Sequence, residues 1–125
     1  QEGVRFDYPI AVDMEANTSI NSLTTQQRTS LLQYALDILY QKGYYGIAYT
    51  YTSFANNLLY MSQLSGYDLW IADYRGYVGY QGAFTMWQYS SSAQIAGING
   101  NVDVNCSYKD YATFIRLNGY NHWNR

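Results

Sequence analysis

Two acidic residues with one residue between them follow an apolar segment near the start of the chain. Asp13 and Glu15 end the run 8–15, in which Pro9 stands at a strand start, where no backbone N–H is required. Side chains two apart on a strand point to the same face, so both carboxylates would lie side by side. Burial of such a pair would be costly without a chemical purpose. Two like charges so close together also raise the pKa of one acid, which suits the proton donor that glycoside hydrolysis needs.

The same pair has a purely structural explanation, because acids two apart are common and often cap helices or pair with arginine. The position of the pair favours a catalytic role, since polar or aromatic side chains end every segment that we interpret as a strand. In a parallel barrel the strand ends share one rim, where active sites form. These side chains are Asp13, Glu15, Tyr49, Tyr51, Asp73, Tyr74, residues 87–89, Asp103 and Asn105.

Strand-like and helix-like segments alternate along the first part of the chain, which is typical of a parallel α/β sheet. We expect strands at 8–15, 46–51, 68–74, 84–89 and 102–106. We expect one helix from Thr24 or Thr25 to about 42 and a second from Ser53 to 65. A third helix should begin after a capping box of Ser107 and Asp110 and run to about 118. The connections 75–83 and 90–101 show no convincing helix. Gly43 and Gly119 should end helices, and residues 120–125 should form a tail.

Composition restricts the classes of function. The length of 125 residues and 48% hydrophobic content fit one globular domain. Seven basic and nine acidic residues form no basic stripe, so we expect no nucleic-acid partner. A single cysteine and a single histidine make a metal cluster improbable, and we expect neither a metal nor a cofactor. No stretch reaches the roughly 18 apolar residues of a membrane helix, and no signal peptide is recognisable, so we expect a soluble protein without a membrane partner.

Aromatic residues make up 18% of the chain, with 16 tyrosines, against only 13% charged residues, and this imbalance has two explanations. Tyrosines can simply pack in a core or a barrel wall. Alternatively, flat rings can stack on sugar faces while Tyr hydroxyls and Trp N–H groups hydrogen-bond sugar hydroxyls.

Other candidate residues remain open. Asp103 follows the turn signal Asn99-Gly100 and could hold that loop, and Asp73 could face either the rim or a helix, so it stays unassigned. A nucleophilic pair of Cys106 and His122 is disfavoured, because no pattern suggests that they meet.

The ordered motifs of the chain resemble those of the family 25 glycoside hydrolases, the barrel-type lysozymes. The resemblance extends from about Tyr8 to Phe114. It rests on Asp13-Met14-Glu15, on Ile47-Ala48-Tyr49-Thr50, and on the segments 69–74, 87–90 and 97–105.

This resemblance implies an N-acetylmuramidase that cuts peptidoglycan glycan strands, secreted or associated with the cell wall. It implies Glu15 as acid/base, Asp13 orienting the substrate's own N-acetyl group as nucleophile with retention of configuration, and Asp103 hydrogen-bonding within the site. The implied sugar groove is lined by Tyr49, Trp70, Tyr74, Trp87 and Gln88.

The implied fold is an α/β barrel of the TIM-like type, with five strand-helix units followed by three strands. Such a barrel takes about 250 residues, so residues 1–125 would be the C-terminal portion of a single lysozyme catalytic domain, covering its last five strands. Open parallel edges are disfavoured, and we expect an N-terminal fragment or a second chain to complete the barrel. The alternatives are a non-catalytic module that binds cell-wall glycan and a chitinase-like hydrolase.

Overall fold

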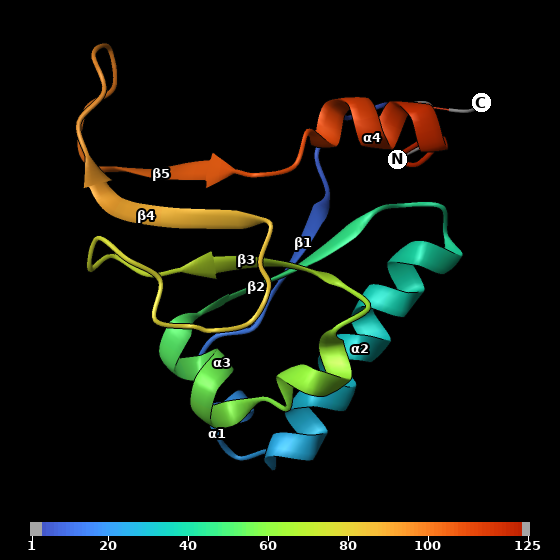
Figure 1. Ribbon diagram of the computed structural model, residues 1–125, viewed down its shortest axis with the longest axis vertical. Coiled ribbons are helices and arrows are strands. Elements are labelled where there is room, and N and C mark those ends of the chain that lie inside the picture. The colour runs from blue at the N-terminus through green and yellow to red at the C-terminus, as the bar shows by residue number, and fades with distance from the viewer. Residues whose placement is uncertain (1–3, 124–125) are drawn as a thin grey trace.

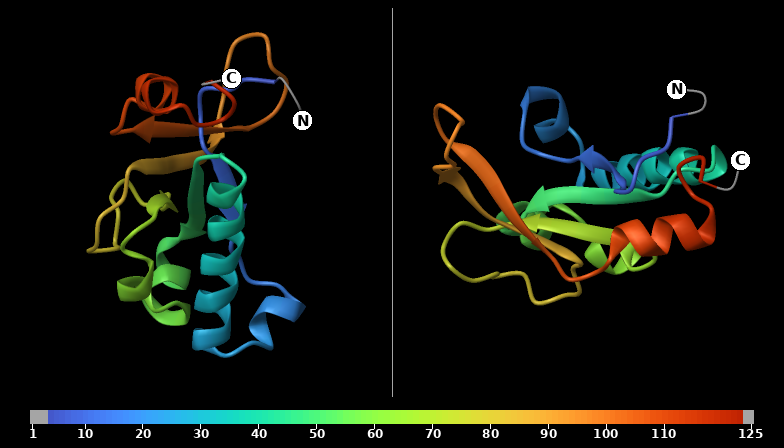
Figure 2. Two further views of the ribbon diagram at one scale, coloured as in Figure 1. Left: turned by 90° about the vertical axis from the view of Figure 1, so that its right-hand side faces the viewer. Right: turned by 90° about the horizontal axis from the view of Figure 1, so that it is seen from above.

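A five-stranded sheet forms the centre of the computed structural model, which describes residues 4–123. The strands follow chain order across the sheet, and the sheet curves (Figures 1 and 2). They are β1 (Ile10–Asp13), β2 (Gly46–Tyr51), β3 (Asp68–Ala72), β4 (Met86–Ala93) and β5 (Val102–Ser107). The first four strands pair in parallel, whereas β5 runs antiparallel to β4. The predicted number of strands is confirmed.

Helices cover both faces of the sheet, at different places. The long helix α2 (Thr25–Gln41) and the shorter α3 (Thr52–Leu58) lie on one side, with the four-residue helix α1 (Thr18–Asn21) beside them, while α4 (Tyr111–Asn118) lies on the other side (Figure 1). No helix within residues 4–123 is both long and apolar enough to cross a membrane.

Alternation along the strands builds two separate apolar cores. Ala48 of β2 packs with the helices α2 and α3, whereas its neighbour Ile47 faces the opposite side and packs with Tyr111 and Ile115 of α4. We call the side that carries Ile47 the inner face. Within residues 4–123, α4 packs only on the end of this face where the parallel strands begin, and no helix covers the end where they finish.

The helix boundaries follow local capping chemistry, with one correction. Thr24 and Gln27 form a capping box at the start of α2. At α4 the predicted box with Ser107 is absent, because Asp110 itself is the N-cap and accepts a hydrogen bond from the backbone of Thr113 at 3.2 Å. Gly119 ends α4 with a left-handed φ of 73°, as expected.

The single helix expected from Ser53 to residue 65 is in fact broken into α3 and a short 3-10 helix, Met61–Leu64. The break has a tertiary cause. Arg28 Nε of α2 donates to the carbonyl of Leu58 at 2.8 Å, and Thr29 Oγ1 accepts from the N–H of Tyr60 at 2.9 Å. Contacts with α2 thus replace the hydrogen bonds that a continuous helix would have made.

The end of the described chain is not the expected tail. Asn121 is fully buried, and its Oδ1 accepts from the N–H of Tyr45 at 3.0 Å. Its Nδ2 donates to the carbonyls of Phe6 at 3.2 Å and Tyr8 at 3.0 Å. Asn121 therefore fastens the segment before β1 to the segment after α4, which lie side by side in Figure 2. Residues 124–125 of the expected tail lie outside the described residues.

We predict that Asn121→Ala lowers the free energy of unfolding by about 2–4 kcal/mol, because one buried and two partly buried backbone groups would lose their partners. Urea denaturation of both proteins measures this loss. Asn118→Ala is the matched control, since Asn118 is exposed and donates only within its own helix, to the carbonyl of Phe114 at 2.8 Å. It should change stability by no more than about 0.5 kcal/mol. Equal losses in the two variants would contradict the role given to Asn121.

Candidate active site

Asp13 and Glu15 lie on the same side of the chain, as their spacing predicts. Met14 between them is buried in the helix-side core. Its N–H donates to the carbonyl of Tyr49 at 2.9 Å, and its carbonyl accepts from Thr50 Oγ1 at 2.7 Å. These bonds extend the strand geometry beyond β1. Both carboxylates consequently line one hollow of about 270 Å³ on the inner face.

The carboxylate pair is exposed, contrary to the expectation of burial. The reason is that β1 is an edge strand and α4 does not cover this end of the inner face. The pKa of Glu15 is nevertheless raised, first by its hydrogen bond with Asp13, then by partial desolvation and by the negative charge of Asp13. The pKa of one acid of the pair, Glu15, is therefore raised, in the direction that the spacing predicts.

Asp103 also lies in this hollow, but the strand direction that places it there differs from the one expected. The expectation that all strands end at one rim is wrong for β5, which is antiparallel to β4. In an antiparallel pair the start of one strand lies beside the end of the other. Asp103 stands near the start of β5, and it therefore joins Asp13 and Glu15 in the hollow of about 270 Å³.

Gln88 organises the wall of this hollow. Its side chain is almost fully buried, and its Oε1 accepts hydrogen bonds from the hydroxyls of Tyr49 at 2.8 Å and Tyr74 at 2.5 Å. Trp70 stands against Tyr49, with ring centroids 4.7 Å apart, and its Nε1 donates to Asn105 Oδ1 at 2.8 Å. The structure thus gathers four of the five expected groove residues around the carboxylates.

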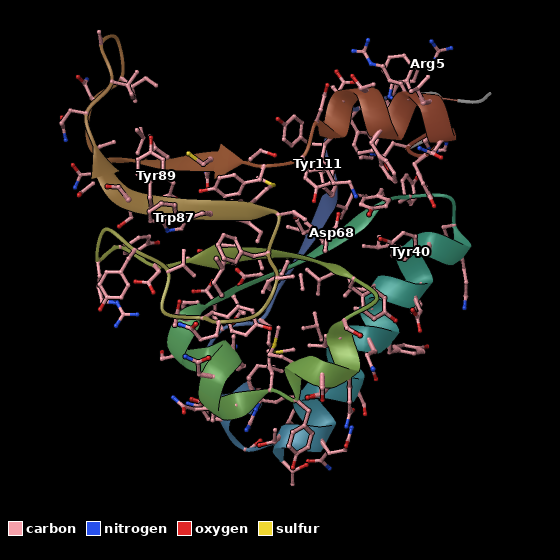
Figure 3. All side chains as sticks on the ribbon, in the orientation of Figure 1. Arg5, Tyr40, Asp68, Trp87, Tyr89 and Tyr111 are labelled. Atoms are coloured by element: carbon pink, nitrogen blue, oxygen red, sulfur yellow. The ribbon has the colours of Figure 1, made fainter. Side chains whose placement is uncertain are left out.

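Trp87 is the expected groove residue that the structure does not bring to the cleft. It packs with the core on the helix side, and its Nε1 donates to the backbone carbonyl of Asp73 at 2.9 Å (Figure 3). The reason is strand alternation, because Gln88 faces the inner side and its neighbour on β4 must face away.

A second, larger hollow of about 930 Å³ meets the first at Glu15 and Tyr49. Asp73, left unassigned by the sequence, is buried at its edge and accepts from Thr52 Oγ1 at 2.7 Å and from the N–H of Gly79 at 2.9 Å. An ion pair with Arg75 is the main reason that the pKa of Asp73 lies well below its usual range. Asp73 shapes this hollow, and sequence analysis singled out neither Arg75 nor Gly79.

The other candidate chemistry finds no support in the geometry. Cys106 is exposed on β5, whereas His122 hydrogen-bonds with Tyr44 at 3.0 Å beyond α4, so the two do not form a pair. Over residues 4–123, no three His, Cys, Asp or Glu side chains are grouped so that they could hold a metal ion.

Comparison with known proteins decides the family. The model of the family described as glycosyl hydrolases family 25 matches residues 3–98. The chain belongs to this family. The match ends before β5, so the place of Asp103 in this family 25 chain rests on the structure alone. No curated protein sequence matches the chain.

Solved structures share the fold of this family 25 chain. The CTP1L endolysin superposes with a TM-score of 0.71 at 23% identity over 87% of this chain, and a family 25 glycosyl hydrolase from Bacillus anthracis with 0.68 at 23% over 90%. The autolysin LytC from Streptococcus pneumoniae, solved with a synthetic peptidoglycan ligand, gives 0.61 at 28% over 78%. The chain spans 38%, 54% and 25% of these three proteins, respectively. The expected partial barrel is confirmed.

We predict that Asp13→Asn lowers the pKa of Glu15, because the variant removes the carboxylate that accepts a hydrogen bond from protonated Glu15 and that repels its charged form. Carbon-13 NMR titration of the Glu15 carboxyl group measures this pKa directly. Asp110→Asn is the control, since Asp110 is an exposed cap of α4 and Asn caps equally well. A Glu15 pKa that is unchanged or higher in Asp13→Asn would contradict the coupling of the two acids.

The same coupling predicts a pH dependence of stability. A raised pKa in the folded state means that Glu15 favours folding below its unfolded pKa, and that this contribution is lost as the pH rises through the folded pKa. Glu15→Gln should therefore gain stability relative to the native chain between acidic and neutral pH. Urea denaturation at several pH values tests this, and a relative loss with rising pH would contradict it.

Proposed function

We propose that this chain carries the acid/base part of a lysozyme active site, which cleaves the β-1,4 bond between N-acetylmuramic acid and N-acetylglucosamine in peptidoglycan. The observation that carries the proposal is the meeting of Asp13, Glu15 and Asp103 in one hollow. Membership of glycosyl hydrolase family 25 supports it.

Glu15 acts as the acid and then as the base. Its raised pKa keeps a proton available for the leaving glycosidic oxygen. After the leaving sugar departs, the Glu15 carboxylate takes a proton from the incoming water, and the side chain returns to its starting state.

Asp13 assists the substrate's own acetamido group. Because Asp13 and Glu15 project from the same side of one strand, neither easily reaches the opposite face of the sugar, where a direct nucleophile must stand. The acetamido oxygen instead bonds to C1 while the bond from C1 to the leaving oxygen breaks and that oxygen takes the proton of Glu15. The resulting oxazolinium ring is positively charged, and Asp13 holds its N–H and offsets this charge. Water then attacks C1 from the face that the leaving sugar occupied and opens the oxazolinium ring, so the configuration at C1 is retained. We assign Asp103, which lines the same hollow, a hydrogen-bonding role within the site.

The aromatic residues around the carboxylates bind the sugars. Tyr74 is half exposed, and the hydrogen bond of its hydroxyl to Gln88 fixes its ring. Trp70 has its N–H engaged by Asn105, so it offers its ring face to a sugar. Tyr49, Trp70 and Tyr74, ordered around Gln88, form the sugar-binding wall.

Exposure of the carboxylate pair favours one second candidate, a glycan-binding module without turnover, because general acid catalysis gains from exclusion of water. A chitinase-like hydrolase remains the other alternative, since it too can place two such acids on a barrel strand.

The deciding experiment compares the native chain with Glu15→Gln on purified peptidoglycan. We predict that the variant releases new reducing ends at least about a hundredfold more slowly, because general acid catalysis is lost. Its sedimentation with peptidoglycan should be unchanged, and Asp110→Asn should behave like the native chain. Equal rates in the native chain and Glu15→Gln would contradict the assignment, and binding of the native chain without turnover would establish the glycan-binding module.

Two product analyses test the finer claims. Borohydride reduction of the products should yield muramitol, whereas glucosaminitol would indicate the chitinase-like specificity. Proton NMR during hydrolysis should show the β-anomer first, because the reaction retains configuration. An α-anomer formed first would contradict the assisted mechanism.

A further inference from the structure

A fixed cation stands in the larger hollow beside Glu15. Arg75 lines this hollow of about 930 Å³, and its side chain is 54% exposed. Asp73, which is only 3% exposed, accepts from Arg75 Nε at 2.7 Å and from Arg75 Nη2 at 2.6 Å. Such a two-point pair fixes the plane of the guanidinium as well as its position.

The loop after β3 closes around this guanidinium. Tyr77 stacks on it, with Arg75 Cζ 4.8 Å from the ring centroid. Gly79 approaches so closely that a Cβ there would lie 2.5 Å from Arg75 Nη2. Its N–H also donates to Asp73 Oδ2 at 2.9 Å, so loop and ion pair hold each other in place.

The guanidinium keeps donors to spare. Asp73 takes up the edge made by Nε and Nη2, and no side chain or carbonyl within residues 4–123 accepts a hydrogen bond from Arg75 Nη1. The remaining polar lining of the hollow includes the exposed amides of Asn56 and Gln81. A charged donor already held in position, in the same hollow as the acid Glu15, suits a carboxylate on the bound substrate.

We propose that Arg75 binds a carboxylate carried by the muramic acid residue, and that this contact distinguishes peptidoglycan from chitin. The inference rests on the proposed function. Both polymers are β-1,4-linked N-acetylated sugars, but only muramic acid carries a lactyl group. Its carboxyl is either free or amide-linked to a stem peptide that has carboxylates of its own. A neutral chitin chain carries no carboxylate that Arg75 could bind.

The chain contains a matched control for this arginine. Arg116 of α4 also pairs with an aspartate at two points, Asp7 at 2.9 and 2.7 Å, and also stacks on an aromatic ring, that of Trp123 at 4.5 Å. Its side chain is 51% exposed, close to the value for Arg75. Arg116 lines neither hollow, and its partner Asp7 is more exposed, at 37%, than Asp73 at 3%.

The test titrates the nitrogen-15-labelled chain by NMR with three probes. They are chitobiose, the disaccharide of N-acetylglucosamine and N-acetylmuramic acid with a free lactyl carboxylate, and that disaccharide carrying L-alanyl-D-isoglutamine. We expect at least one muramic probe to bind about tenfold more tightly than chitobiose, the value of one exposed charge-assisted contact. The preferred muramic probe identifies the carboxylate as lactyl or as peptide.

Arg75→Gln should reduce this preference to within about twofold while the affinity for chitobiose stays the same, and Arg116→Gln should keep the preference. Arg75→Lys guards against misfolding, because it keeps a positive charge beside Asp73 but lacks the second donor edge, so it too should lose the preference. Equal binding of all probes by the native chain, or a preference that persists in Arg75→Gln, would overturn the inference and leave the proposed function standing. If no probe shifts the Glu15 and Tyr49 resonances, both proposals fail.

Discussion

The burial of Met14 fixes the geometry on which the site depends. With Met14 packed in the helix-side core and its backbone tied to Tyr49 and Thr50, the residues on either side of it must project from the inner face. A shift by one residue in the pairing of β1 with β2 would turn both carboxylates into the apolar core. An ordinary packing contact thus orients Asp13 and Glu15, and the pKa of Glu15 follows from the proximity that this contact imposes.

The inner face is divided into a closed half and an open half, and this division accounts for much of the aromatic content. In the closed half, Tyr111, Asp68 and Tyr40 follow one another between α4 and α2 (Figure 3). Asp68 accepts there from Tyr45, from Tyr111 and from Lys109, so buried hydroxyls and charge are satisfied together. Other tyrosines line the open half. The first explanation offered for the tyrosines, packing, thus applies to the closed half, and the second, sugar binding, stays a prediction for the open half.

Local sequence patterns predicted the helices and strands well, but predicted their arrangement in space less well. The strand Gly46–Tyr51 and the helix Thr25–Gln41 follow from apolar runs and caps that lie within a few residues of each other. The direction of β5 depends on a hairpin for which the turn signal Asn99-Gly100 is a local cue, although we expected a parallel strand. The break after α3 depends on Arg28, far away in sequence. Alternation along β4 could have shown that Trp87 and Gln88 cannot share a face. Arg75 carries no sequence signal, because its partners come together only in the folded loop.

The central claim is that a glycan lies across the open half of the inner face with its scissile bond at Glu15. A crystal structure of the Glu15→Gln chain with a tetrasaccharide of alternating N-acetylglucosamine and N-acetylmuramic acid tests it most directly. The account predicts a glycosidic oxygen about 3 Å from the side chain at position 15, with the adjacent acetamido group against Asp13. A tetrasaccharide bound on the helix-covered face around Trp87, or bound with its acetamido group turned away from Asp13, would contradict it.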